Sequence, residues 1–251
     1  MNIEFAAIPG SGKTYLMNEL YKYLKNNLNE KEYSIFTYKD IDDIKSTENK
    51  HKRFRRIHLI KNFIMLLDIH IIKLIYMYAK KKEPIKIKLK SISYIMHMLW
   101  NQKIVNQIEN NSRKKNIFIL DENLFHLSNF YLEKDQDEKI SGKYFYLLEK
   151  AKKIRYEKNS NLYVLIDSDR MENYHRMNKR NQGWPSIWKN LSNEDKKNVL
   201  VESQERYETL KRYVNDSGII YTTINNEVFR EKYEDEFEKI IKKMEMILMK
   251  R

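Results

Sequence analysis

The sequence feature that most constrains the fold is a short apolar run that leads directly into a glycine-rich turn. The run, Asn2–Ile8, is followed by Pro9-Gly10-Ser11-Gly12-Lys13-Thr14, and a pattern typical of a helix continues to Leu28. Glycine at positions 10 and 12 lets the backbone wrap closely around an anion, so that its N–H groups point at phosphate oxygens. A helix that starts there presents the positive end of its dipole to the same anion. Strand, turn and helix in this order predict a phosphate-binding loop.

The spacing of the turn assigns roles to its side chains. It fits the pattern G-x-x-x-x-G-K-[ST], with Ala7 where the first glycine would stand. In this pattern the lysine reaches the β- and γ-phosphates of a nucleotide, and the hydroxyl of the next residue ligates Mg²⁺. We therefore predict that ATP is bound by Pro9, Gly10, Ser11, Gly12, Lys13 and Thr14, with Lys13 also catalytic and Thr14 also a metal ligand.

The rest of the chain alternates between apolar runs and helical patterns. Runs with the length of buried strands lie at Tyr33–Tyr38, Asn116–Leu120, Leu162–Ile166 and Ile219–Ile224. Helical patterns lie at Asn123–Glu133, Lys143–Lys158, Arg170–Asn181, Glu194–Asn215 and Val228–Leu248. Only five glycines and three prolines occur in 251 residues, which argues against a turn-dense β fold. This alternation predicts an α/β fold of three layers, a five-stranded parallel sheet covered by helices on both faces, with its site at the carboxyl ends of the strands.

The stretch between the second and third predicted strands contains no convincing strand. Its pattern predicts two helices, Glu48–Lys81 and Ser91–Asn111, joined near Pro84. The chain is thus divided into a P-loop nucleotide-binding core, formed by residues 1–40 and 115–251, and a large helical insert formed by residues 41–114. We expect the insert to select the acceptor molecule.

The chain carries a formal charge of +13, from 48 Lys and Arg residues against 35 Asp and Glu residues. Basic clusters at 50–56 and 80–90 flank the apolar segment Ile57–Ala79, so a membrane has to be considered. A spanning helix is excluded, because residues such as Lys61 and Asp68 interrupt the segment and each would cost roughly 2.5–3.5 kcal/mol at the bilayer centre. Two interpretations stay open: an amphipathic helix buried against its own protein, or a helix that contacts a membrane surface or a lipid-linked acceptor.

Several classes of site are excluded by residue type. The sequence has no cysteine, which rules out disulfides, thiolate zinc sites and iron–sulfur clusters. Its six histidines show no metal-binding spacing. The first four residues, Met1-Asn2-Ile3-Glu4, lack the basic start of a signal peptide, so we expect a cytoplasmic protein, with peripheral contact at the inner face of the membrane as an alternative.

Two carboxylates follow the third predicted strand. Asp121 and Glu122 come directly after Asn116–Leu120. In a fold with a phosphate loop this position supplies a second contact to Mg²⁺, often through water, and Asp121 fits that role. Glu122 would orient the acceptor or act as the base that takes its proton. The alternative is that Asp121 caps a helix and Glu122 is solvated.

The segment Pro9-Gly10-Ser11-Gly12-Lys13-Thr14 resembles the loop of the P-loop nucleoside and nucleotide kinases, the group that includes adenylate and thymidylate kinases. The likeness in layout extends over most of the chain. It implies a five-stranded parallel core, an acceptor-binding helical section between the second and third strands, and an arginine-bearing lid after the fourth strand.

The resemblance also implies roles for residues after three other strands. Asp40, nearest to the end of the second strand, would take the proton of an acceptor hydroxyl; the alternative is a polar loop that caps the next helix. Arg176 and Arg180, four residues apart and hence on one face of a predicted helix, would grip the transferring phosphates; the alternative is an ordinary charged surface helix. Asn225, after the fifth strand, would contact the adenine base.

These features predict an ATP- and Mg²⁺-dependent kinase that transfers the γ-phosphoryl group to a nucleoside, a nucleotide, a sugar or a glycan. Whether Asp40 or Glu122 is the base stays open. A second class is a P-loop ATPase or switch that acts on a protein or a membrane-bound partner, although the chain has no Leu-Ser-Gly-Gly-Gln segment. A third class, nucleic-acid binding through the basic clusters, is supported by no recognised motif.

Overall fold

The computed structural model describes residues 1–48, 60, 64, 67–80, 85–121, 143, 146–147, 150, 161–181, 183–185, 188–226 and 233–249. The predicted helix Asn123–Glu133 and the candidate base Glu122 lie outside these residues, as does most of the predicted helix Lys143–Lys158.

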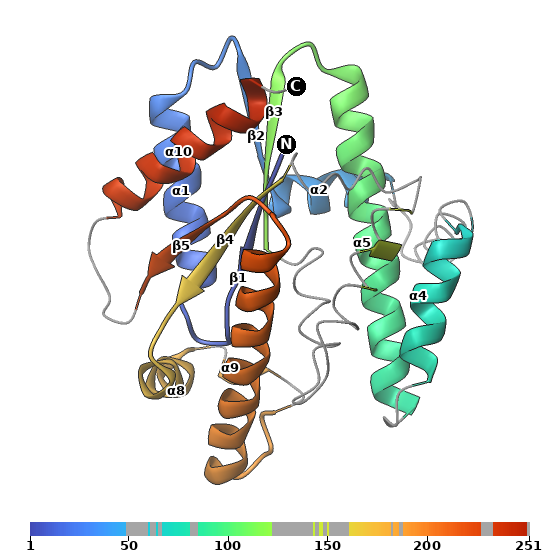
Figure 1. The fold of residues 1–251 in the computed structure, drawn as a ribbon, viewed down its shortest axis with the longest axis vertical. Helices are drawn as coiled ribbons and strands as arrows, with labels where there is room; N and C mark the ends of the chain where they lie inside the picture. The colour runs from blue at the N-terminus through green and yellow to red at the C-terminus, as the bar shows by residue number, and fades with distance from the viewer. Residues whose placement is uncertain are drawn as a thin grey trace.

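The core is one sheet of five parallel strands (Figure 1). The strands are β1 (Asn2–Ala6), β2 (Tyr33–Thr37), β3 (Lys115–Leu120), β4 (Asn161–Asp167) and β5 (Tyr221–Asn225), in the spatial order β2-β3-β1-β4-β5. All five predicted strands are present, each within two residues of its expected ends. The central strand β1 pairs with both β3 and β4, and all five of its residues are buried. Burial on both faces is why these strands read as nearly continuous apolar runs. The predicted fold class is confirmed.

Two helices cover one face of the sheet. They are α1 (Lys13–Asn27) and α10 (Glu234–Met249). Leu16, Leu20 and Leu24 of α1 recur at helical spacing and pack with Ile240 of α10 against Ile3 of β1. The prediction placed the start of α10 at Val228, but Tyr233 is not helical and the helix begins at Glu234.

The opposite face is covered by α5 (Ile85–Asn111) and α9 (Asn193–Asp216), and α4 (Ile69–Ala79) lies outside α5 (Figure 1). A further helix, α2 (Tyr38–Glu48), follows β2 and packs with α5 beside β3. Helix α8 (Arg170–Lys179) lies just past the carboxyl end of β4. These helices place α2, α4 and α5 between β2 and β3, as expected for an insert.

The boundaries inside the insert differ from the prediction. The single helix Glu48–Lys81 is wrong, because Leu67 and Asp68 are not helical. Asp68 instead caps α4, since its Oδ1 accepts hydrogen bonds from the backbone N–H groups of His70 (2.8 Å) and Ile71 (3.0 Å). Helix α5 begins six residues before the predicted Ser91. Its first residues alternate between apolar and basic types, which hides the helical period.

None of the helices within the described residues is both long enough and apolar enough to cross a membrane.

Candidate functional site

The predicted phosphate loop lies between β1 and α1 and has the backbone that the motif requires. Gly10 and Gly12 have φ angles of 83° and 82°, in the left-handed region that side chains other than glycine rarely adopt. Gly12 is the N-cap of α1, and among the described residues no side chain caps this helix. Asp169 and Ser192, in contrast, cap α8 and α9 through their side-chain oxygens. The start of α1 is therefore suited to binding an anion.

Two other segments pack closely against the loop. A Cβ atom on Gly10 would lie 2.6 Å from the carbonyl oxygen of Asn173 and 3.0 Å from Cγ of Met177, both in α8. A Cβ atom on Gly12 would lie 2.9 Å from Nδ2 of Asn226, just after β5. Both glycines are thus required by space as well as by dihedral angle.

Lys13 and Asp121, two of the predicted site residues, form an ion pair. Lys13 Nζ lies 2.6 Å from Asp121 Oδ1, and it also donates to the backbone carbonyl of Asp121 over 3.4 Å. The two side chains are 19% and 27% exposed, so the pair is partly shielded from water. Asp121 follows β3, and the pairing of β3 with β1 brings it beside the loop. Each group thus serves as the counter-ion of the other at the position where a nucleotide phosphate and a cation are expected.

The oxygen donors at this position suit Mg²⁺. The metal prefers hard oxygen ligands and is usually held by one or two carboxylates together with substrate phosphates and waters. Thr14 supplies a hydroxyl at the start of α1 and Asp121 supplies a carboxylate beside the loop. Among the described residues there is no group of three or more His, Asp or Glu side chains that would hold a metal without a substrate.

Asp40 lies in the first turn of α2, where it takes part in helix capping. Its Oδ2 accepts hydrogen bonds from the backbone N–H (2.6 Å) and the hydroxyl (2.7 Å) of Thr37. Thr37 Oγ1 faces the Asp40 N–H in return, at 3.4 Å. This reciprocal arrangement is a capping box. The alternative interpretation of Asp40 was a polar loop that caps the next helix. Asp40 does take part in a cap, but it lies inside the first turn of that helix and not in a loop before it.

Arg176 and Arg180 do not share a helical face, in contrast to the prediction. Helix α8 ends at Lys179, and Arg180 is exposed and extended, with φ −69° and ψ 129°. Arg176 Nε donates to Glu172 Oε1 over 3.1 Å. Its Nη2 atom is buried and has no hydrogen-bond partner among the described residues.

The segment after β5 contacts the loop through Asn226, the residue that follows Asn225, for which contact with the adenine base stays a prediction. Asn225 is exposed, whereas Asn226 is buried. The side-chain amide of Asn226 donates to the carbonyl oxygen of Ser11 over 2.6 Å, and Tyr233 donates its hydroxyl to Asn226 Oδ1. Sequence reasoning missed both Asn226 and Tyr233. The only available signal was the pair of asparagines at the end of the strand.

A second group that the sequence did not reveal lies at the end of β4. Asp167 accepts hydrogen bonds from the hydroxyl of Tyr207 (2.9 Å) and from Nζ of Lys211 (2.7 Å), both in α9. Burial, together with the nearby charge of Asp167, raises the pKa of Tyr207 far above its usual value. Tyr207 therefore stays a neutral donor over the whole physiological range.

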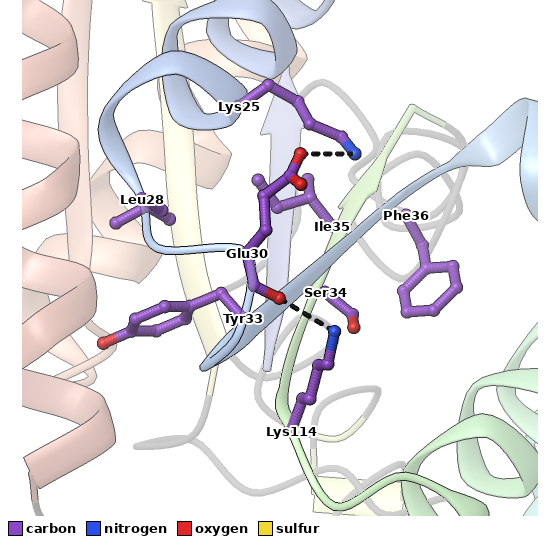
Figure 2. A pocket seen from close by; sticks show the side chains of 8 residues that line it. All are labelled: Lys25, Leu28, Glu30, Tyr33, Ser34, Ile35, Phe36 and Lys114. Atoms are coloured by element: carbon purple, nitrogen blue, oxygen red, sulfur yellow. Dashed lines mark hydrogen bonds and ion pairs between the residues drawn. The ribbon is translucent and has the colours of Figure 1, made fainter.

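A pocket of about 250 Å³ lies at the opposite end of the sheet (Figure 2). It is lined by the end of α1, by β2 and by Lys114, next to the first residue of β3. Glu30 crosses the pocket, and its carboxylate lies 3.8 Å from Nζ of Lys25. The backbone carbonyl of Glu30 accepts a 2.8 Å hydrogen bond from Nζ of Lys114. Because β2 begins here, the pocket is separated from the phosphate loop by the length of the strands.

No family model and no curated protein matches the chain. Three of the solved structures that match it show the range of identity. A deoxyadenosine kinase from M. mycoides is 14% identical, with 98% of this chain and 100% of that chain covered and a TM-score of 0.47. A shikimate kinase from Bacteroides thetaiotaomicron is 9% identical, with 98% of each chain covered and a TM-score of 0.44. A thymidylate kinase from Candida albicans is 14% identical, with 98% of this chain and 91% of that chain covered and a TM-score of 0.48. All three are kinases. At these identities the likeness concerns the fold alone, and the function of the chain has to be inferred from its own site.

Proposed function

We propose that the protein is an ATP- and Mg²⁺-dependent kinase that transfers the γ-phosphoryl group to a small-molecule acceptor. The observation that carries the proposal is the ion pair between Lys13 and Asp121, set beside a loop with two left-handed glycines and an uncapped helix N-terminus. A lysine aimed at phosphates and an acidic residue for the metal are the two charged parts that phosphoryl transfer needs.

In this proposal the loop residues hold the polyphosphate of ATP through their backbone N–H groups. Lys13 turns from Asp121 to the β- and γ-phosphates, and Thr14 and Asp121 hold Mg²⁺. A bound Mg²⁺ neutralises charge on the phosphate oxygens. Arg176 stabilises charge on the transferring group, and Arg180 and Asn225 contact the nucleotide from outside the loop.

Buried polar atoms near the loop support a polar ligand there. Ser11 Oγ, Asn173 Oδ1 and Arg176 Nη2 are buried without a hydrogen-bond partner among the described residues. Leaving such an atom unsatisfied costs about 1–3 kcal/mol, so native proteins rarely do so without a ligand or ordered water. Asn173 also touches the loop at Gly10, and Arg176 follows it by three residues in α8.

The acceptor is a nucleoside, a nucleotide, a sugar or a glycan, selected by the helical insert 41–114. The direct test is a screen of these compounds with ATP labelled in the γ-phosphate. A kinase labels one class of acceptor and hydrolyses ATP slowly by itself. Rapid hydrolysis that no acceptor stimulates would instead favour the ATPase or switch, the second candidate.

Asp40 and Glu122 are both candidates for the base that takes the acceptor proton. Because an asparagine oxygen can still accept the hydrogen bonds from Thr37, Asp40→Asn preserves the capping box and removes only the basic group. We therefore expect one of the two variants, Asp40→Asn or Glu122→Gln, to lower kcat by about 100-fold or more, because it removes the base. The melting temperature of that variant should stay the same.

Contact of the insert with a membrane is a separate part of the proposal. Ile69, Ile72 and Tyr76 of α4 and Ile85 and Leu89 of α5 are each at least half exposed. The lysines at 73 and 80 are exposed on α4 and beside its end. Apolar side chains next to lysines suit an anionic lipid surface. The test is flotation of the full chain with phosphatidylserine vesicles, compared with flotation of the double variant Ile72→Ser/Tyr76→Ser. Membrane contact through this surface predicts lower recovery of the double variant with the vesicles. Equal recovery of the two proteins would contradict membrane contact through this surface.

A further inference from the structure

A chain of hydrogen bonds ties the phosphate loop to the start of the last helix. The hydroxyl of Tyr233 donates to Asn226 Oδ1, and Nδ2 of Asn226 donates to the carbonyl oxygen of Ser11. The backbone N–H of Asn226 donates to the carbonyl of Asp167 at the end of β4, over 2.7 Å. Asn226 is 1% exposed and Tyr233 is 3% exposed, so water competes little with these bonds.

The bond to Ser11 acts on the part of the loop that faces an anion. Ser11 lies between the two left-handed glycines, where a loop that binds phosphate must direct its N–H groups inward and its carbonyl groups outward. The amide of Asn226 takes the Ser11 carbonyl as its acceptor and so holds it on the outer side of the loop. Rotation of that carbonyl toward the ligand would place a partial negative charge beside the phosphates.

The hydroxyl of Tyr233 stabilises the orientation of the Asn226 amide that the Ser11 carbonyl requires. The oxygen and nitrogen ends of an asparagine amide have nearly the same shape, so packing alone hardly distinguishes them. The Ser11 carbonyl can only accept, so it requires the NH₂ end of the amide at the loop, and Oδ1 at the other end then accepts from the Tyr233 hydroxyl. The ring of Tyr233 is itself held by contacts with Tyr15 of α1 and Phe237 of α10, with centroid distances of 6.5 Å and 6.1 Å.

We propose that Asn226 and Tyr233 are positioning residues that keep the loop in its phosphate-binding form and thereby set the affinity for the polyphosphate of the nucleotide. The part about affinity rests on the proposed function; the part about loop conformation does not. Neither residue touches the reacting atoms in this proposal. They act through the Ser11 carbonyl.

The conformational part is tested without nucleotide. Hydrogen exchange of the amides of residues 10–14 is measured in the unaltered protein, in Tyr233→Phe and in Tyr23→Phe. Tyr23 packs on the same Phe237 ring at 5.5 Å, which makes it a matched control. We expect Tyr233→Phe to exchange about fivefold faster in the loop, because one net hydrogen bond of about 1 kcal/mol is lost, and Tyr23→Phe to leave the loop unchanged. Equal loop exchange in all three proteins would overturn the positioning role.

The affinity part is tested by calorimetric titration with Mg²⁺ and ATP. Asn226→Asp places an acceptor opposite the Ser11 carbonyl, and we expect it to weaken binding about tenfold or more at pH 8, by the loss of one hydrogen bond and the added repulsion. The ratio of the Kd of Asn226→Asp to the Kd of the unaltered protein should be smaller at pH 5, because a protonated carboxyl can donate to the Ser11 carbonyl again. A ratio that does not depend on pH would contradict this role. Absence of ATP binding in the unaltered protein would count against the proposed function, whereas the exchange result would still stand.

Discussion

At the residue scale, the site is defined by a few side chains whose environment leaves little choice of residue. Lys13 and Asp121 neutralise each other across 108 positions of sequence. Gly10 and Gly12 adopt left-handed dihedral angles in places where no Cβ fits. These four residues were predicted from the motif and from the strand end, because the chemistry of phosphate binding needs those residue types at that spacing. Asn226 was not predicted, because its contact with Ser11 joins positions 215 residues apart.

A prediction at this scale concerns Gly12. Gly12→Ala should weaken ATP binding about tenfold or more, because the left-handed conformation costs an alanine about 1–2 kcal/mol and its methyl group would press on Asn226. The control is Gly218→Ala, at φ 70° in the turn before β5, where nothing lies within 4 Å of the added methyl. It should lower the melting temperature without affecting ATP binding. Equal binding by the two variants would contradict the account of the loop.

At the element scale, three helices begin at a side-chain capping signal just before their first residue. Helix α2 starts at a capping box formed by Thr37 and Asp40, α4 at Asp68 and α8 at Asp169. The sequence contains these signals, but it does not say whether a carboxylate after a strand serves a helix or a reaction. That ambiguity explains why α2 was not predicted as a helix.

A prediction at this scale concerns the cap of α8. Asp169 Oδ1 accepts from the N–H of Glu172 over 2.7 Å, and Ser192 Oγ accepts from the N–H of Asp195 over 3.1 Å in α9. Asp169→Ala and Ser192→Ala should each cost about 1 kcal/mol of unfolding free energy, measured by urea denaturation. Only Asp169→Ala should also weaken ATP binding, because α8 packs on Gly10. Weaker binding in Ser192→Ala alone would contradict this.

Another prediction concerns the bond between α9 and β4 and its dependence on pH. Tyr207→Phe should lower the unfolding free energy at pH 7 by about 1 kcal/mol, because Asp167 loses a hydrogen bond. The pKa of Tyr207 is raised in the folded protein, whereas an unfolded tyrosine has a pKa of about 10. The stabilisation by Tyr207 is therefore complete below about pH 10 and decreases as the pH rises above that value. The difference from the unaltered protein should therefore shrink between pH 9 and pH 11. Tyr76→Phe, at an exposed tyrosine, is the control. A constant difference would contradict the assignment.

At the scale of the whole molecule, the parallel sheet brings the ends of all five strands to one edge. The loop follows β1, Asp121 follows β3, and Asn226 follows β5, while Asp167 ends β4 and Thr37 ends β2. The sheet could be predicted because strands buried on both faces are apolar runs. The strand order and register could not, because they depend on pairing between distant residues. The division into a core at 1–40 and 115–251 and an insert at 41–114 stays a prediction.

The central claim is that the loop holds the polyphosphate of a nucleotide through Lys13. Its most direct test is calorimetric titration of Mg²⁺ and ATP into the unaltered protein, Lys13→Met and Lys25→Met. Lys25 lies on the same helix but far from the loop, 3.8 Å from Glu30. We expect a Kd between about 1 μM and 1 mM for the unaltered protein, the same value for Lys25→Met, and binding at least about tenfold weaker for Lys13→Met. Equal binding by all three proteins, or none by the unaltered protein, would contradict the claim.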